Sequence, residues 1–378
     1  MWLKNKWNYG CHIDILIFGL GRVGSFLLEY LLDLSEKRIH IIVVGRDLNK
    51  ISRDVNIIKA GAYLRGLLQS KVTIDTCDFT NVSLISDVIG KHKPDIIINV
   101  SRLVVENFTW GYAEQGLWVP LKTNFSKQIM CGVQTVGYDP TVIDVQFPDV
   151  TNAWLKSANV KYPEFGAGNF NHLIPKMMLG LIRFYPLLDP ALFDITLSTS
   201  HYHSSALTHN HDMKNIEPLL NISYLGNDFV YDRTELLKAC SIQMRPSDKM
   251  RTLAASSIHE IIRKLLLCFT TGCKVKLHVP GFDGEMGGYP ITITSCDGLK
   301  INWVEDYFSL QEMRQHNSAS VKCEGVEKIE NGVLHFTDEL LTLAYSRFKT
   351  RFPDKIVFSE IDQYCDYIID ISRRVPTA

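Results

Sequence analysis

The chain carries no excess of charge of either sign and no apolar run long enough to cross a bilayer. Its 378 residues include 40 basic and 41 acidic side chains, for a net charge of -1 at pH 7. This balance gives no electrostatic footprint for nucleic acid. The apolar stretch IDILIFGLG falls far short of the about 18 residues that a membrane helix needs, and no signal-peptide core follows Lys4 and Lys6. We therefore expect neither a nucleic-acid nor a membrane partner.

Paired cysteines, internal repeats and low-complexity linkers are missing as well. The nine cysteines are scattered, odd in number and without a Cys-x-x-Cys pair. Scattered thiols are typical of a reduced cytoplasmic protein, and we expect that location. The length favours about two domains.

The first part of the chain alternates apolar strand patterns with helical patterns. This alternation predicts a doubly wound parallel (Rossmann) sheet. The expected strands are IDILIFG (13–19), IHIIVVG (39–45), KVTIDTCDF (71–79), PDIIINV (94–100) and TVIDVQF (141–147).

Beyond about residue 165 the pattern changes to period-two runs joined by Gly and Asp turns. Such runs indicate an antiparallel sheet with one solvated face. The sequence therefore predicts an α/β protein with a dinucleotide-binding domain at 1–165 and an α+β substrate domain at 166–378, whose last helices could pack back on the first domain. The runs include FDITLSTSHYH, CKVKLHVPG, YPITITS and LKINWV.

A complete Gly-x-Gly-x-x-Gly motif follows the first strand directly. It reads Gly19-Leu20-Gly21-Arg22-Val23-Gly24 and opens a helical pattern. In this context Gly19 permits the tight turn, Gly21 lets a pyrophosphate approach, and Gly24 lets the helix pack on the strand. A tight turn without a ligand is the alternative.

The end of the second strand bears on which dinucleotide binds. The chain has Gly45 and Arg46 where an NAD enzyme usually carries a carboxylate, which favours the 2′-phosphate of NADP, although Asp47 keeps NAD open. Asp78 follows the third strand, where adenine is expected. Asn99 and Ser101 follow the fourth, near the nicotinamide ribose.

Four motifs of the first half occur in a set order: ILIFGLGRVG, VVGRD, TCDFTN and KPDIIINVS. Through these motifs, roughly the first 150 residues of the chain resemble the saccharopine dehydrogenase-like group of oxidoreductases. The resemblance implies a nicotinamide cofactor and hydride transfer at a carbon–nitrogen bond of an amino acid or polyamine. GAGNFNHLIP (166–175) departs from the Gly-x-x-Pro-Gly turn of relatives, which leaves the substrate open.

Two further segments combine small and polar residues at expected helix starts. Asp149 follows Pro148, and GAGNFNH brings Asn169, Asn171 and His172 together. These side chains are candidates for substrate contact, and helix capping is an equal alternative.

Four of the twelve histidines fall in HYHSSALTHNHD (201–212). If the preceding strand continues through this stretch, His201 and His203 share one face. We predict that they transfer a proton or bind substrate in the interdomain cleft, with Lys176 and Tyr289 as further catalytic candidates. Without nearby cysteines or paired carboxylates, we expect no metal. An exposed polar loop is the alternative.

The sequence thus predicts an NADP-dependent oxidoreductase acting on a small polar molecule, an amino acid, imine or related compound. A cofactor-retaining isomerase or cyclase and a non-catalytic NADP(H)-binding sensor or scaffold remain alternatives. A homodimer is also open.

Overall fold

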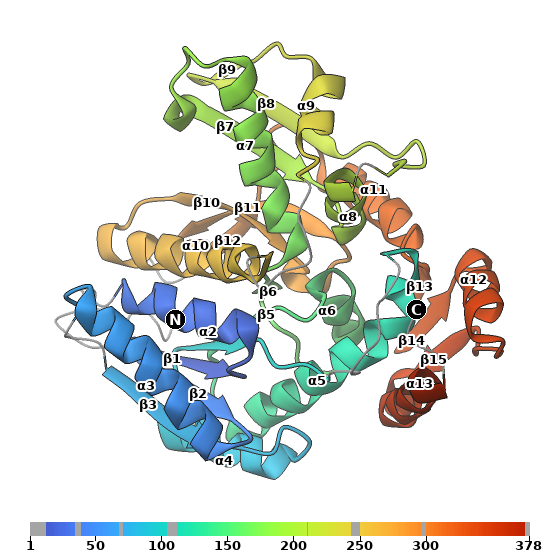
Figure 1. The fold of residues 1–378 in the computed structure, drawn as a ribbon. Helices are drawn as coiled ribbons and strands as arrows, with labels where there is room; N and C mark the ends of the chain where they lie inside the picture. Colours follow the sequence, from blue (N-terminus) through green and yellow to red (C-terminus); the bar gives the residue numbers. More distant parts are fainter. Residues whose placement is uncertain are drawn as a thin grey trace.

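A computed structural model describes residues 13–34, 39–67, 71–103, 112–209, 211–242, 250–295 and 300–374. Figure 1 shows a large sheet with helices on both faces, an upper lobe, and a small sheet near the C-terminus. Within these ranges no helix is long and apolar enough to cross a membrane.

The large sheet has six strands, all parallel, in the order β3-β2-β1-β4-β5-β6. The order reverses between β1 and β4, and in sheets of this kind ligands bind beyond the carboxyl ends of the strands at that point. The strands are β1 (Ile13–Phe18), β2 (Ile39–Gly45), β3 (Lys71–Thr76), β4 (Ile96–Asn99), β5 (Thr141–Asp144) and β6 (Phe165–Gly166).

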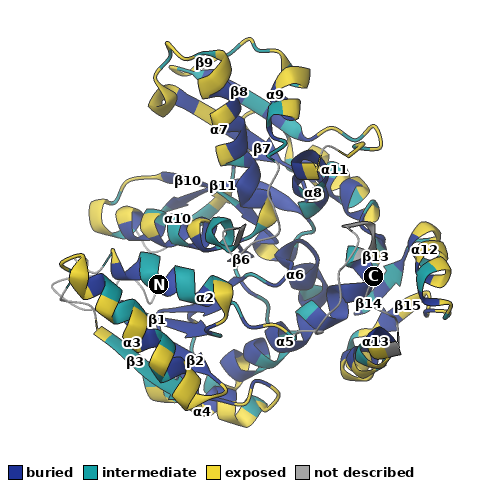
Figure 2. Cartoon of the chain, in the orientation of Figure 1, coloured by how far each residue is buried: buried dark blue, intermediate teal, exposed yellow. Residues whose placement is uncertain are grey.

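The continuous apolar runs of the central strands supply two separate cores. Ile15 and Ile17 of β1 belong to one core and Leu16 and Phe18 to the other, because successive side chains point to opposite faces. The first core also takes in α2 (Arg22–Leu32), α3 (Leu48–Leu64) and α10 (Met250–Thr271); the second takes in α4 (Val82–His92) and α5 (Val119–Val136). Figure 2 shows the central strands buried and α3 exposed on its outer side. The predicted Rossmann sheet is confirmed.

The second half contains antiparallel sheets, as predicted, but the residues described there form three small ones with three strands each. The first consists of β7 (Phe193–Ser198), β8 (Leu219–Tyr224) and β9 (Asn227–Asp228), backed by α7 (Leu173–Phe184) and α9 (Arg233–Ala239). The second consists of β10 (Val275–Pro280), β11 (Gly288–Thr294) and β12 (Lys300–Trp303). The third consists of β13 (Val326–Glu330), β14 (Val333–Phe336) and β15 (Lys355–Val357).

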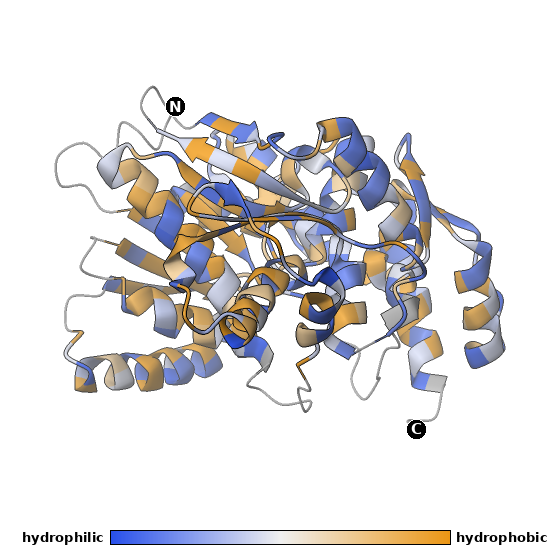
Figure 3. Cartoon of the chain, turned by 90° about the horizontal axis from the view of Figure 1, so that it is seen from above, coloured by the Kyte–Doolittle hydropathy of each residue, from blue (hydrophilic) through white to orange (hydrophobic). Residues whose placement is uncertain are grey.

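Each small sheet is covered by helices of its own part of the chain. α10 packs on both α2 and the second sheet. α12 (Asp338–Phe348) and α13 (Ile361–Arg374) cover the third sheet, and α13 also contacts α5. Figure 3 shows hydrophobic and hydrophilic positions mixed along the outer helices, as amphipathic helices require. The boundary between residues 165 and 166 stays a prediction, and β6 spans it.

The strand expected to run through His203 ends earlier. β7 stops at Ser198, and His201–His209 forms helix α8. The Ser200 hydroxyl accepts the N–H of Tyr202 at 3.2 Å, and Asp149 Oδ1 accepts the N–H of His201 at 2.9 Å. These two acceptors satisfy the first donors of a helix, so the chain turns here. The expectation that His201 and His203 share a strand face is therefore wrong.

Strand β6 lies so close to helix α6 (Pro148–Ser157) that it accepts no side chain at Gly166. A Cβ there would stand 2.1 Å from Cβ of Pro148, whereas a Cβ at Gly168 would meet nothing within 4 Å. We predict that Gly166→Ala lowers the free energy of unfolding by about 1–3 kcal/mol, because the proline ring must move. Gly168→Ala, the matched control, should change it little. Urea unfolding monitored by circular dichroism measures both, and equal stability of the two variants would contradict the packing.

Candidate functional site

The glycine turn between β1 and α2 is shaped by contacts that need glycine at two of its three positions. Gly19 has a φ of +101°, and a Cβ on Gly24 would lie 2.4 Å from the carbonyl oxygen of Gly19. A Cβ on Gly21 would meet nothing within 4 Å. No side chain caps α2, which begins with Arg22 and Val23. Open space and a helix start without a side-chain cap therefore coincide at Gly21, which fits a dinucleotide pyrophosphate.

Arg46 and Asp47, the two residues after β2, have different environments. Arg46 is exposed, while the Asp47 carboxylate caps α3 by accepting the N–H of Lys50 at 3.0 Å. A Cβ on Gly45 would stand 2.5 Å from Ile51 Cδ1, so packing also favours glycine there. Asp78 follows β3 and accepts the N–H and hydroxyl of Thr80, which with nearby Arg46 lowers its pKa.

A buried polar network holds the turn after β4 against the glycine motif. The Asn99 side chain donates to Ser126 at 3.0 Å and to Asp144 at 2.9 Å, and its oxygen accepts the N–H and hydroxyl of Ser101. Backbone atoms of Ser101 lie 3.0 Å from where a Gly19 Cβ would stand. Asn99 and Ser101 thus hold the backbone where the strand order reverses.

An acid–base cluster lies past the ends of β5 and β6. The ring of His201 bonds through Nδ1 to Glu324, a fully buried carboxylate just beyond α11 (Leu310–Lys322), and through Nε2 to the Asn169 amide at 2.6 Å. An Nδ1–H donor leaves Nε2 as the acceptor of the Asn169 N–H. Glu324 Oε2 has no hydrogen-bond partner within the described ranges. Asp149, in the first turn of α6, is buried, and burial raises its pKa to about 6.

Lys122 of α5 and Phe147 complete this cluster. The Lys122 ammonium lies 4.2 Å from the ring centroid of Phe147, whose centroid is 4.9 Å from that of His201. Burial lowers the pKa of Lys122 to about 8, although Glu324 and Asp149 nearby oppose the shift. Its only hydrogen bond within the described residues goes to Gln115 at 2.7 Å. Phe147 has a φ of +59° directly before Pro148, a strained backbone of the kind that occurs at functional sites.

Three arginines connect this cluster to the glycine turn. The side chain of Arg102 is exposed, but partial desolvation together with nearby Arg251 and Arg22 lowers its pKa. Arg102 is in turn close enough to Lys122 to contribute to the lowered pKa of that lysine. Arg102 and Arg251 form no ion pair with a described carboxylate. A positively charged strip therefore runs from α2 to the His201 ring, and it suits an anionic ligand.

The other predicted catalytic residues form hydrogen bonds inside the protein. Both ring nitrogens of fully buried His203 are bonded, to the Thr199 hydroxyl and to the Ile216 carbonyl, each at 2.5 Å. Lys176 is buried against the Thr208 hydroxyl, and burial lowers its pKa to about 8. The Tyr289 hydroxyl donates to the Met286 carbonyl at 2.7 Å.

Some of the predicted substrate residues are likewise held inside the protein, and others contact His201. Asn171 bridges Gly168 and His278 and caps the short helix before α7. His172 is buried, burial lowers its pKa to about 3, and its Nε2 has no partner among the described residues. Asp149 and Asn169 contact His201 directly. In the described ranges no three His, Cys, Asp or Glu side chains are grouped to hold a metal ion.

Sequence reasoning missed Lys122, Phe147 and Glu324. Lys122 and Glu324 carry no local motif, because they come from α5 and from the turn after α11, both far from the histidines in sequence. Phe147 did carry a signal, since it precedes Pro148 at the end of a predicted strand.

Comparison with known proteins identifies the fold. No protein-family model and no curated sequence matches the chain. Similar solved structures include the malate dehydrogenases of Aeropyrum pernix (13% identity, TM-score 0.57, 82% of this chain and 97% of that one) and Cryptosporidium parvum (12%, 0.56, 82% and 96%). Another is the lactate dehydrogenase of Cryptosporidium parvum, solved with lactic acid and nicotinamide adenine dinucleotide (13%, 0.56, 82% and 95%).

These similarities extend over nearly the whole of the solved chains. The protein thus has the fold of the dinucleotide-binding dehydrogenases. At such low identity the similarity carries the fold alone. It agrees with the Rossmann half of the expected resemblance and does not single out the saccharopine dehydrogenase-like group.

The raised pKa of Asp149 has a consequence for stability. Because the folded state holds the proton more tightly than the unfolded chain, this carboxyl stabilises the fold below about pH 4, and the contribution is lost as pH rises through about 6. Asp149→Asn keeps an acceptor for the His201 N–H without the charge. We predict that the stability of the wild type relative to this variant falls by on the order of 2 kcal/mol across that window. Urea unfolding at several pH values measures it, and parallel curves would contradict a neutral buried carboxyl.

Proposed function

We propose that the protein is an NADP-dependent oxidoreductase that transfers a hydride to or from a small polar anion, an amino acid or imine. The observation that carries the proposal is the adjacency of two features. An open, uncapped glycine turn lies at the sheet reversal, and a cationic strip leads from it to the buried His201–Glu324 pair.

The dinucleotide would lie along the carboxyl edge of β1 to β4. Gly21 and the N–H groups at the start of α2 would hold its pyrophosphate, with Arg46 at the 2′-phosphate and Asp78 near the adenine. Ser101, held by Asn99, would line the ribose of the nicotinamide end. The bound nicotinamide supplies or accepts the hydride.

NADP is favoured over NAD by the residues after β2. Exposed Arg46 forms no hydrogen bond or ion pair with a described residue, so its guanidinium can meet a phosphate. Asp47 already caps α3 and is less available to a ribose 2′-hydroxyl.

His201 would carry the proton that accompanies the hydride. Glu324 accepts from Nδ1 and thereby orients the ring. Nε2 then faces Asn169, and a substrate atom replacing that amide would receive or lose the proton there. His203 cannot share this role in the present arrangement, because both of its nitrogens are bonded.

The cations would select the substrate. Lys122 and Arg102 lie on the side of the cluster that faces the glycine turn, and neither has a carboxylate partner among the described residues. A substrate carboxylate placed there would gain a charge-assisted bond and would bring its neighbouring carbon toward both the nicotinamide and His201. Asp149 and Glu324 would accept from an amine or imine N–H on the same substrate.

A screen of amino acids, imines and 2-oxo acids with amines tests the proposal by following NADPH absorbance. We predict net cofactor oxidation or reduction with at least one anionic substrate. His201→Gln should lower turnover by roughly 10²- to 10⁴-fold, because it removes the proton carrier. His209→Gln, at the exposed end of the same helix, is the matched control.

Gly21→Val should abolish cofactor binding while the protein stays folded, because its side chain enters the open space before α2. Product formed without net NADPH consumption would assign the protein to the cofactor-retaining isomerases. Tight NADPH binding with no turnover would make it a sensor or scaffold, and unchanged NADPH affinity in Gly21→Val would remove the site.

Arg46→Ala tests the choice of cofactor. We predict that this change weakens NADPH binding by about 1.5–3 kcal/mol, the value of a charge-assisted hydrogen bond, and leaves NADH binding almost unchanged. Arg53→Ala, an arginine on α3 that bonds its own helix at Asn49, is the control. Fluorescence titration gives both affinities. A wild-type protein that prefers NADH would contradict the assignment.

A further inference from the structure

A second pocket lies farther along helix α6 than the cluster, toward the end of the helix, where four segments meet. Its volume is about 440 Å³. The segments are α6, the turn between β10 and β11, α11 and β13, which are neighbours in Figure 1. The lining residues that the argument uses are Ala153, Lys156, Glu285, Met286, Arg314 and Ile329.

Charges of both signs line this pocket and leave hydrogen-bonding groups unused. Arg314 Nη2 donates to Glu285 Oε1 at 2.8 Å, and Lys156 Nζ lies 3.5 Å from the same oxygen. Arg314 Nε and Nη1 have no acceptor among the described residues, and Glu285 Oε2 has no donor. Free donors and a free acceptor therefore stand side by side.

An apolar wall faces these charges. Met286, Ile329 and Ala153 line the same hollow. Tyr289 contributes its ring, and its hydroxyl is held by the Met286 carbonyl at 2.7 Å. A ligand that fits the pocket thus has one anionic group, one cationic group and an apolar part.

We propose that this pocket is a binding site for a zwitterionic α-amino acid with an apolar side chain. Its carboxylate would bond the free edge of Arg314, its ammonium would donate to Glu285 Oε2, and its side chain would lie on Met286 and Ile329. A simple anion fits less well, because Glu285 and Asp283 already balance the charges of Arg314 and Lys156.

The pocket is separate from the candidate active site but shares a helix with it. Asp149 stands at the start of α6 and Lys156 near its end, about 10 Å apart along the axis. The turn that carries Glu285 also donates the N–H of Gly287 to the Asp149 carbonyl at 3.0 Å. This site lies outside the proposed reaction, and its test needs no cofactor.

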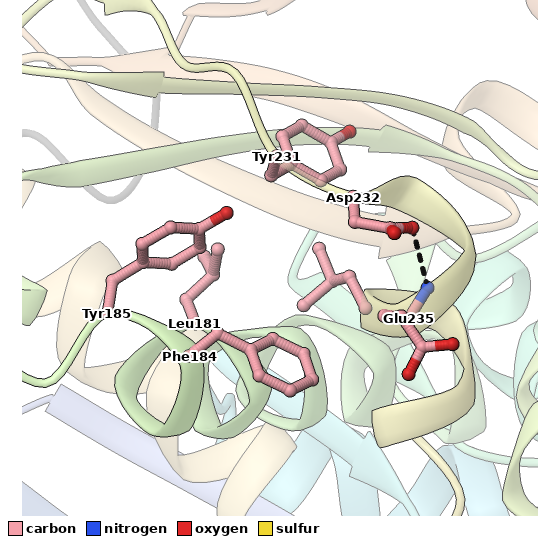
Figure 4. Close-up of a pocket in the computed structure, with 7 residues that line it drawn as sticks. Leu181, Phe184, Tyr185, Tyr231, Asp232 and Glu235 are labelled. Carbon is pink, nitrogen blue, oxygen red and sulfur yellow. Dashed lines mark hydrogen bonds between the residues drawn. The ribbon is translucent and has the colours of Figure 1, made fainter.

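The pocket between α7 and α9 offers no comparable chemistry. Figure 4 shows Phe184, Tyr185 and Tyr231 around it, and the Asp232 carboxylate already accepts the N–H of Glu235 at 3.0 Å. No cation lines that hollow of about 200 Å³.

Calorimetric titration of the full chain with L-leucine tests the proposal. 4-Methylpentanoate lacks the ammonium and isopentylamine lacks the carboxylate, so each should bind at least 10-fold more weakly than leucine. Arg314→Gln and Glu285→Gln should each weaken leucine binding at least 10-fold, since each removes one charged contact. Arg53→Gln, an arginine on α3, is the control for loss of a surface charge, and thermal unfolding checks that each variant folds.

The same titration on His201→Gln separates the two sites. Unchanged leucine binding there, with loss in Arg314→Gln or Glu285→Gln, supports the second pocket. Loss in His201→Gln alone would place leucine at the candidate active site and overturn the proposal. So would equal binding of leucine and 4-methylpentanoate, or no binding of leucine, L-methionine and L-phenylalanine.

Discussion

The buried carboxylate of Asp149 is the constraint on which the candidate site depends. It accepts the N–H of His201 and so begins α8 at the point where β7 has ended. The backbone carbonyl of the same residue accepts the N–H of Gly287 from the turn between β10 and β11. One residue at the start of α6 therefore holds two segments of the second half against the carboxyl edge of the parallel sheet. A carboxylate out of water must be bonded or neutral, and Asp149 is bonded while its pKa is raised to about 6.

The sheet edge itself is shaped by backbone contacts that exclude side chains. Gly19, Gly24 and Ser101 approach one another so closely that the turn accepts no side chain at either glycine. The hydrogen bond between Asn99 and Asp144 holds the adjoining end of β4 in place. Burial raises the pKa of Asp144 to about 7, so its bonds to Asn99 and Ser126 compensate a costly burial. Of the three glycines in the turn, only Gly21 has open space beside it, where a pyrophosphate would need it.

Charge is distributed differently near the two ends of α6. Near its start the cations Lys122, Arg102 and Arg251 form no ion pair with a described carboxylate, and His201 is oriented by Glu324. Near its end Lys156 and Arg314 share Glu285. The first arrangement suits an anion that reacts, and the second suits a ligand whose charges balance. The turn between β10 and β11 and the third small sheet both contact this helix.

Local pattern was sufficient for the first half of the molecule. The buried strands, the glycine turn and the helix after Pro148 were predictable because each depends on neighbours in sequence: period-two burial, a close strand–helix turn, and proline at a first helical turn. Antiparallel structure in the second half was likewise predictable from its alternation.

The structure of the histidine stretch was not predictable from the sequence. His201–His209 is a helix because Asp149, 52 positions earlier in the chain, supplies an acceptor there. In the same way Glu324 gives His201 its orientation from 123 positions away, and the pKa of Lys122 is lowered by burial and by nearby Arg102, both of which exist only in the folded chain. Spacing in sequence reports which groups share a strand or a turn. Packing between elements distant in sequence decides which carboxylate contacts which imidazole. Hydrogen bonds between such elements produce no periodic pattern in the sequence.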